Sequence, residues 1–132
     1  MKNLLFIPFL FMCSMVIGQS TKIIGTPIKL EKLEVAQNDF PKMMTWYEAK
    51  NACAILGEGW RLPTKDELDL LYQYKDEIGS FRQSLDNYYW SSTEKGGAAW
   101  GKNFGYDRQQ SLDVGNYGFN DYVSNARAVR SF

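Results

Sequence analysis

The pattern of apolar residues predicts a helix in the first half of the chain. Its apolar positions are spaced by three, four and three residues: Trp46, Ala49, Cys53 and Leu56. This spacing places them on one face of a helix. Thr45 and Glu48 form a capping box at its start, and Gly57 follows its last apolar residue. We therefore expect an amphipathic helix with one buried face.

A second helix is predicted from about Lys65 to Tyr74. Pro63 disfavours a helical conformation in the residue before it, so the chain should be extended at that point. Thr64 and Glu67 then repeat the capping-box pattern ahead of another apolar stripe. Residues 59–63 are therefore expected to form a fixed joint between the two helices.

Alternating apolar residues predict strands in the rest of the chain. Between Ile28 and Val35 the alternation shifts by one position, which predicts two short strands or one strand with a bulge. Later candidate strands are short and separated by glycines. They are Tyr88–Ser92, Ala98–Phe104, Leu112–Val114 and Ala126–Arg130. This order favours an α+β domain with two helices packed on one side of small antiparallel sheets.

The first residues have the pattern of a secretory signal peptide. Lys2 precedes an almost wholly apolar run from Leu4 to Ile17, and Gly18 is a small residue suited to cleavage. We expect residues 1–18 to be removed, 19–27 to be a flexible lead-in and 28–132 to be the domain. Two alternatives are a retained membrane anchor and lipid attachment at Cys13. The protein is then expected in the periplasm, at the cell surface or outside the cell, with no membrane span after cleavage.

Charge and composition argue against several functions. The chain has 15 basic and 15 acidic residues and no histidine. A balanced charge does not suit nucleic-acid binding, which requires a basic surface. Without histidine the chain cannot form Ser-His-Asp or Cys-His catalytic arrangements, or most zinc sites. We therefore expect a protein without catalysis, metal or cofactor.

Cys53 would be the single cysteine left after signal cleavage, so it could not form an internal disulfide. It could pair with another chain or react as a thiol. Its place on the apolar helix face favours a third interpretation, in which it is a small buried hydrophobic residue.

Several separate motifs together resemble one bacterial family. They are the Trp46–Cys53 helix, Gly59-Trp60-Arg61-Leu62-Pro63-Thr64, Tyr89-Trp90-Ser91-Ser92-Thr93, Ala99-Trp100 and Arg127-Ala128-Val129-Arg130. The family is the C-type-lectin-like domain found at the C-terminus of the Legionella collagen-like adhesin. The resemblance covers residues 33–132. It implies a C-type-lectin-like fold, with neighbouring chain ends, and an exported binding module.

The resemblance also assigns structural roles. It implies that the following residues support the fold and do not contact a ligand: Trp46, Cys53, Trp60, Arg61, Pro63, Thr64, Glu67, Trp90, Trp100, Arg127 and Arg130. Many lectin-like relatives join the first helix to the last strand by a disulfide, but Ala128 stands where a partner cysteine could be. The first helix and the last strand should instead be held together by the packing of Trp46, Trp60, Trp90 and Val129. The Glu-Pro-Asn, Gln-Pro-Asp and Trp-Asn-Asp tripeptides of calcium-dependent sugar binders are absent.

The arginines have two possible roles. A guanidinium group can recognise an acidic ligand, or it can join elements within the fold. For Arg61, Arg127 and Arg130 we favour the second role, with Glu48, Asp66 or Glu67 as partners.

Loops in the second half of the chain hold the residues best suited to ligand contact. Tyrosine gives apolar area with a polar end, and asparagine gives adaptable hydrogen bonds. The candidates are Tyr106, Asp107, Arg108, Asn116, Tyr117, Phe119, Asn120, Asp121 and Tyr122. An equally open alternative is that some of these rings complete the core.

Three functions follow from these observations. The first is a non-catalytic module, used for binding or adhesion, that recognises a glycan, peptide or protein. The second is an assembly subunit that forms homo-oligomers through Cys53 or the loop aromatics. The third is a hydrolase that uses loop carboxylates, chosen from Glu94, Asp107, Asp113 and Asp121.

Overall fold

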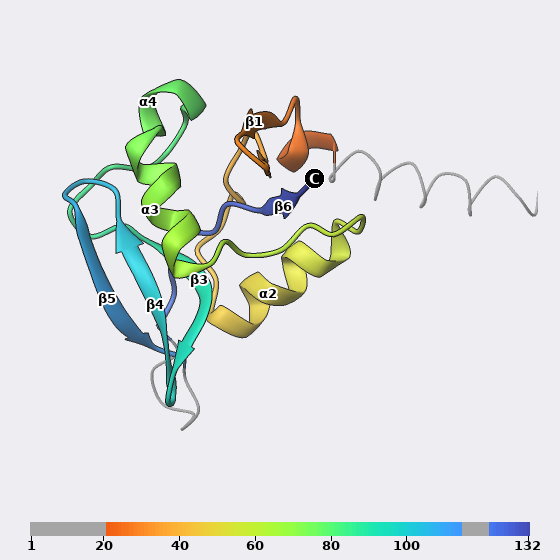
Figure 1. Cartoon of the computed structure of the whole chain (residues 1–132). Coiled ribbons are helices and arrows are strands. Elements are labelled where there is room, and N and C mark those ends of the chain that lie inside the picture. The colour runs from red at the N-terminus through yellow and green to blue at the C-terminus, as the bar shows by residue number, and fades with distance from the viewer. Residues whose placement is uncertain (1–20, 115–121) are drawn as a thin grey trace, which may run out of the picture.

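The computed structural model describes residues 21–114 and 122–132. Its helices are α2 (Trp46–Ile55), α3 (Lys65–Gln73) and α4 (Lys75–Ile78). Its strands are β1 (Ile28–Leu30), β2 (Leu33–Val35), β3 (Tyr88–Lys95), β4 (Ala98–Asn103), β5 (Arg108–Asp113) and β6 (Val129–Ser131). The order of elements confirms the predicted α+β class (Figure 1).

The strands form two small antiparallel sheets. One has the order β1-β2-β6, so the last strand returns to pair with the opening hairpin. The other has the order β3-β4-β5. Helix α3 lies against this second sheet, and α2 lies on the opposite side of β3, so the prediction that both helices pack on one side is wrong (Figure 1). The predicted proximity of the two ends of the domain is therefore present.

Both predicted capping boxes are confirmed. The Thr45 hydroxyl accepts a bond from the Glu48 amide at 3.3 Å, and the Glu48 carboxylate accepts one from the Thr45 amide at 3.0 Å. Thr64 and Glu67 make the same pair of bonds at 3.1 and 2.8 Å. These bonds satisfy amide groups that have no partner within the first turn of each helix. Local sequence therefore defines where both helices begin.

The alternation between Ile28 and Val35 corresponds to two strands, one of the two predicted alternatives, joined through Glu31 at a positive φ of 56°. Other strand boundaries differ from the prediction. Strand β5 begins at Arg108, four residues before the predicted start. The last strand begins only at Val129, because the preceding residues bond separately to several segments. Ala126, for example, accepts a bond from the Phe40 amide.

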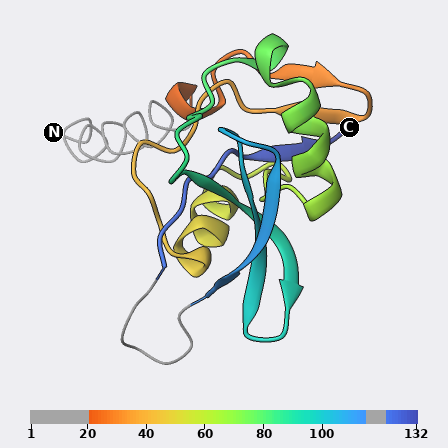
Figure 2. The same ribbon diagram turned by 90° about the vertical axis from the view of Figure 1, so that its left-hand side faces the viewer.

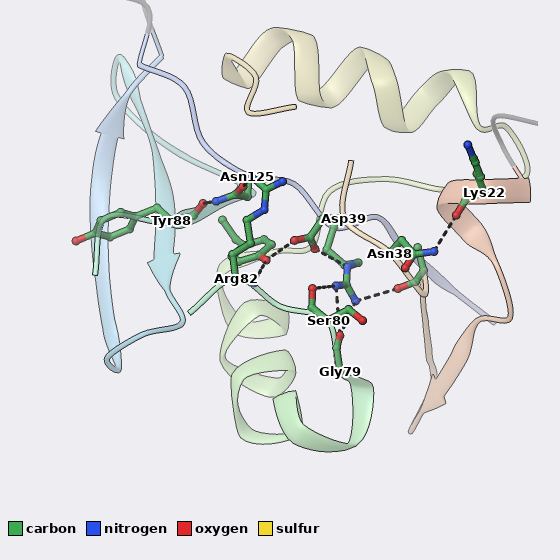
Figure 3. A network of polar contacts seen from close by, with 11 residues as sticks. Lys22, Asn38, Asp39, Gly79, Ser80, Arg82, Tyr88 and Asn125 are labelled. Atoms are coloured by element: carbon green, nitrogen blue, oxygen red, sulfur yellow. Dashed lines mark hydrogen bonds and ion pairs between the residues drawn. The ribbon is translucent and has the colours of Figure 1, made fainter. Parts of the chain in front are cut away.

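Residues 21–27, expected to be part of a flexible lead-in, make specific contacts with residues 37 and 38. The carbonyls of Ile23 and Ile24 accept bonds from the amides of Asn38 and Gln37 at 3.2 and 2.9 Å. The Asn38 side chain donates to the Lys22 carbonyl at 2.8 Å (Figure 3). The described part of this segment is therefore attached to the domain. No helix among the described residues has the length and apolar character needed to cross a bilayer.

The core confirms the predicted packing of tryptophans. Trp46, Trp60, Trp90 and Val129 are at most 4% exposed. The indole nitrogens of Trp46 and Trp90 each donate to a backbone carbonyl at 2.8 Å, so neither polar group is left without a partner. Trp100 differs, because it is only half-buried and lies beneath the Lys65 and Lys95 ammonium groups.

Cys53 is buried in the core, as its place on the helix face suggested. Burial raises the pKa of its thiol to about 12, because a charged thiolate would lose its hydration there. The thiol is therefore neutral and poorly placed for pairing with another chain. This geometry does not favour a dimer formed through Cys53.

Arg127 is at the centre of a buried polar cluster. Its guanidinium is fully buried and donates from Nε to the Asp39 carboxylate at 2.7 Å. Its other nitrogens donate to the carbonyls of Ala36, Gly79 and Ser80 at 3.0–3.4 Å (Figure 3). One side chain therefore joins the last segment of the chain to two loops that are distant in sequence.

Asp39 is the acidic partner in this cluster, and it also accepts a bond from the Tyr89 hydroxyl at 2.5 Å. Burial raises the pKa of its carboxyl group, and the nearby Arg127 charge only partly offsets that effect. The predicted partners of Arg127 were Glu48, Asp66 and Glu67, and that prediction is wrong. Asp39 precedes Pro41 in a turn that local sequence patterns do not relate to the last strand.

The other two arginines also join distant elements. Arg61 makes a two-bond pair with Glu67 at 2.6 and 3.0 Å, as predicted, and also donates to Ser131. Arg130 bonds to Glu34 and Glu58 instead of the predicted carboxylates, and its guanidinium lies over the Trp60 ring. All three arginines therefore have a structural role, although only Arg61 has a predicted partner.

Glu67 should make stability depend on pH. Burial opposes the charge of its carboxylate, but bonds from Arg61 and Thr64 outweigh burial and lower its pKa. A lowered pKa in the folded state contributes stability above the unfolded value of about 4.3, and this contribution is lost as pH falls through the folded value. Glu67→Gln should therefore cost roughly 0.5–1 kcal/mol at pH 7 and much less at pH 3. Denaturant melts of both proteins at the two pH values test this expectation, and an equal cost at both would contradict it.

Candidate functional site

The two faces of the β3-β4-β5 sheet differ in character. Side chains alternate between faces along a strand, and directly paired residues share a face. The register pairs Tyr89 with Lys102 and Lys102 with Gln109, and these side chains face α3. The register also pairs Trp90 with Gly101 and Gly101 with Gln110 on the opposite face.

The face toward α3 is closed by polar contacts. The Lys102 side chain is 3% exposed and forms ion pairs with Asp69, at 2.8 Å, and with Asp107. Burial opposes the charge of Lys102, but the two carboxylates outweigh it and raise its pKa. Gln109 donates to the same Asp69 carboxylate at 2.8 Å. This face is therefore occupied by the chain's own groups.

The opposite face has a surface that we call the tyrosine surface. It consists of Tyr88, Tyr106, Arg108, Gln110 and Tyr122. The Tyr88 ring points away from the Arg127 cluster (Figure 3). Its hydroxyl lies 3.3 Å from the Tyr106 hydroxyl and donates to Gln110 Oε1 at 3.2 Å.

Two of these tyrosines are accessible. Tyr106 is 37% exposed and Tyr122 is 40% exposed. The Tyr122 ring lies edge-on to the buried Trp90 ring, with 6.2 Å between ring centres. Its position is therefore supported from below while its outer side faces solvent. The hydrogen bond with Tyr106 is the main cause of a raised pKa at Tyr88, so the Tyr88 hydroxyl remains a neutral donor and acceptor.

Arg108 is exposed, and its guanidinium has no carboxylate partner among the described residues. Every other arginine in the described ranges has at least one hydrogen bond from its guanidinium. The register pairs Tyr88 with Asn103 and Asn103 with Arg108, so Tyr88 and Arg108 lie on the same face of the sheet, two strands apart. The surface thus combines neutral hydroxyl groups, an amide and a positive charge that is open to a ligand.

The predicted ligand residues do not all lie together. Tyr106, Arg108 and Tyr122 belong to the tyrosine surface. Asp107 does not, because it points to the other face and pairs with Lys102. The other five predicted residues lie outside the described ranges: Asn116, Tyr117, Phe119, Asn120 and Asp121.

Sequence reasoning missed Tyr88 and did not single out Gln110. Tyr88 was assigned to a strand and not considered for contact, and Gln110 was only the last residue of a candidate loop that begins at Tyr106. Side chains alternate between the two faces along a strand, and this rule could have identified Gln110. Gln110 lies two residues after Arg108 on β5 and therefore on the same face. Recognising it required knowing that β5 begins at Arg108.

The acidic side chains among the described residues do not gather into a metal site. No group of three or more acidic or cysteine side chains within residues 21–114 and 122–132 could hold a metal ion. Of the carboxylates proposed for hydrolysis, Asp107 is engaged by Lys102 and Asp121 lies outside the described ranges. The site therefore consists of groups suited to contact and hydrogen bonding.

Comparison with known proteins places the chain within a family and a fold. Residues 25–130 match the family described as the Lcl C-terminal domain. The crystal structure of botrocetin, a C-type-lectin-like protein, is similar with a TM-score of 0.56 and 11% identity. The match covers 82% of this chain and 98% of that chain. At this identity the likeness shows the fold, which is C-type-lectin-like as predicted. A search of curated proteins found no match.

Proposed function

Because the chain belongs to the Lcl C-terminal domain family, we propose that it is a binding module whose contact surface is the tyrosine surface. One observation carries the proposal. Arg108, without a carboxylate partner among the described residues, lies on the same sheet face as Tyr88, whose hydroxyl contacts the partly exposed Tyr106. Tyrosine and arginine are the residues most often found at the centres of binding interfaces.

The arrangement suits binding for a physical reason. A tyrosine ring gives a large contact area but loses little conformational freedom on binding. Tyr106 and Tyr122 are already oriented by Tyr88 and Trp90 in the free protein. Less conformational entropy is therefore lost when a ligand binds. Hydroxyl and amide groups give hydrogen bonds of fixed direction. The ligand is proposed to be extracellular or periplasmic, on the basis of the predicted signal peptide at residues 1–18.

A screen of the purified chain on glycan arrays, on peptide libraries and by pull-down from envelope extracts tests the proposal. For the ligand found, Tyr106→Ala combined with Arg108→Ala should weaken binding at least about tenfold, because each removed group is a direct contact. Tyr74→Ala is a matched control, since Tyr74 is also 37% exposed but lies at the end of α3. Its effect on binding should be small.

Two results would contradict the proposal. One is a folded protein that binds nothing in the three screens. The other is a ligand whose affinity falls as much with Tyr74→Ala as with the double variant. Self-association that disappears only in the double variant would instead favour the assembly subunit, with the same surface acting between copies.

A further inference from the structure

Among the described residues, the part of strand β5 from Arg108 to Ser111 has an edge that no other strand pairs with, unlike the other strands of comparable length. In the order β3-β4-β5, β5 pairs with β4 on one side alone. Figure 2 shows it on the outer side of the sheet, turned toward the viewer. The opposite edge of the sheet is covered, because Trp90 and Ser92 donate to the carbonyls of Asn125 and Pro63 at 3.0 and 2.7 Å.

The edges of the first sheet are protected in other ways. Strand β6 exchanges two backbone bonds with Arg61 through Val129, at 2.8 and 2.9 Å. Strand β1 is only three residues long and has a lysine at its centre. Short length and a central lysine are two common ways of blocking a sheet edge. Within the described residues, β5 is the one long strand that none of these devices protects.

The register identifies which backbone groups are free. In an antiparallel pair, residues alternate between bonding to the partner strand and pointing away from it. The Val114 amide donates to the Gly97 carbonyl, which continues the β4-β5 register and places Arg108, Gln110 and Leu112 in the inward-bonding set. Gln109 and Ser111 therefore direct their amides and carbonyls outward. No bond to these outward groups occurs among the described residues.

Resting on the proposed function, we propose that β5 accepts an extended acidic peptide as an additional strand of the sheet. Backbone bonds to Gln109 and Ser111 would hold the peptide. Its side chains on one face would then lie beside Arg108, Gln110 and Tyr106, and an Asp or Glu there would neutralise Arg108. Strand addition of this kind takes affinity from the backbone and specificity from alternate side chains.

Charge and symmetry favour a peptide over a second copy of the chain. Arg108 and Asp113 are five residues apart and so point to opposite faces of β5. In an antiparallel twofold pairing of two β5 strands, opposing residues share a face. Asp113 of a second copy could therefore never lie opposite Arg108, and β5 has no other carboxylate that could pair with it there. An acidic peptide has no such restriction.

The test uses a displayed library of random twelve-residue linear peptides, selected on the full chain. Selected peptides, labelled and measured by fluorescence polarisation, should contain Asp or Glu and alternate with β-branched or aromatic residues. Ser111→Pro removes one outward amide, and proline is tolerated on edge strands. It should weaken binding at least about tenfold, whereas the matched control Ser111→Ala should change it by less than about twofold. Arg108→Gln should weaken binding and reduce its dependence on salt.

A second measurement leaves the protein unchanged. Two versions of a selected peptide are compared, one N-methylated at its odd-numbered amides and one at its even-numbered amides. One version should lose binding, because its methylated amides face β5, and the other should keep it. Equal binding by Ser111→Pro and Ser111→Ala, or no effect of N-methylation in either version, would overturn the inference. If the free chain dimerises and Ser111→Pro abolishes the dimer, the edge of β5 binds a second copy of the chain. That result would also overturn the inference. A glycan ligand at the tyrosine surface, with no selected peptide, would overturn the inference alone and leave the proposed function standing.

Discussion

Replacing Arg127 by methionine is expected to lower the free energy of unfolding by about 3–5 kcal/mol, because removal of one partner of a buried ion pair leaves the other charge uncompensated. Arg127 is fully buried, so water cannot replace the lost interaction. The carboxylate of Asp39 and the carbonyls of Ala36, Gly79 and Ser80 would all lose a donor. Chemical denaturation at pH 7 measures the effect.

The dependence of this loss on pH follows from Asp39. Its pKa is already raised by burial, and without Arg127 it should rise further. A carboxyl group whose pKa is raised in the folded state binds its proton more tightly there than in the unfolded state. The protein is therefore relatively more stable at low pH, and it loses stability as pH rises through the folded-state pKa of Asp39. The gap between wild type and Arg127→Met should therefore be wider at pH 7 than at pH 4. A gap that is constant or wider at pH 4 would contradict the assignment.

A double-mutant cycle separates the ion pair from packing. Asp39→Asn removes the acidic charge, and combining it with Arg127→Met removes both charges from the buried cluster. Because neither charge then lacks a partner, the double variant should be less destabilised than the sum of the single variants by roughly 1–3 kcal/mol. Additive losses would mean that the two side chains act independently.

Replacing Trp60 by alanine is expected to cost about 3–5 kcal/mol, the range for deletion of a large aromatic side chain from a core. Trp60 is 4% exposed, packs in the cluster around α2 and lies beneath the Arg130 guanidinium. Its removal would leave a cavity and would also leave Arg130 without that ring contact. Thermal and denaturant melts give the measurement.

Trp100→Ala is the matched control for this change, because it deletes the same atoms from a half-buried site beneath two lysines. Trp100→Ala should lower the free energy of unfolding by about 1–2 kcal/mol, mainly from lost cation–π contact and partial burial.

Tyr122→Ala should lower the free energy of unfolding by about 1 kcal/mol or less, since the ring is 40% exposed. Equal losses in all three variants would mean that the tyrosine surface is core and not a contact surface.

The sequence predicted the helices well because their signals are local. Each capping box lies within four consecutive residues, Thr45 to Glu48 and Thr64 to Glu67, so its geometry needs no distant partner. The apolar spacing of α2 likewise identified Cys53 as buried. Strand β5 was predicted too short, because Arg108–Ser111 has no apolar residue to show alternation. Its pairing with β4 comes from the neighbouring strand.

The binding surface was predicted only in part for the same reason. Tyr106, Arg108 and Tyr122 have side chains that identify them in any sequence, whereas Gln110 matters only because β5 places it beside the Tyr88 hydroxyl. Asp107 lies between two residues of the surface but points to the other face. Sequence position alone could not separate them, because neighbouring residues on a strand or turn can face opposite sides.

The sequence by itself therefore determined the fold class, the starts of both helices, the buried tryptophans and the absence of histidine chemistry. Only the tertiary structure decided the partners of Arg127 and Arg130, the different groups that cover the two faces of the second sheet, and the edge of β5 that no described strand pairs with. The physical reason is distance along the chain. Caps and periodic faces depend on residues within a few positions of each other, whereas Arg127 and Asp39 meet across 88 positions and no local rule relates them.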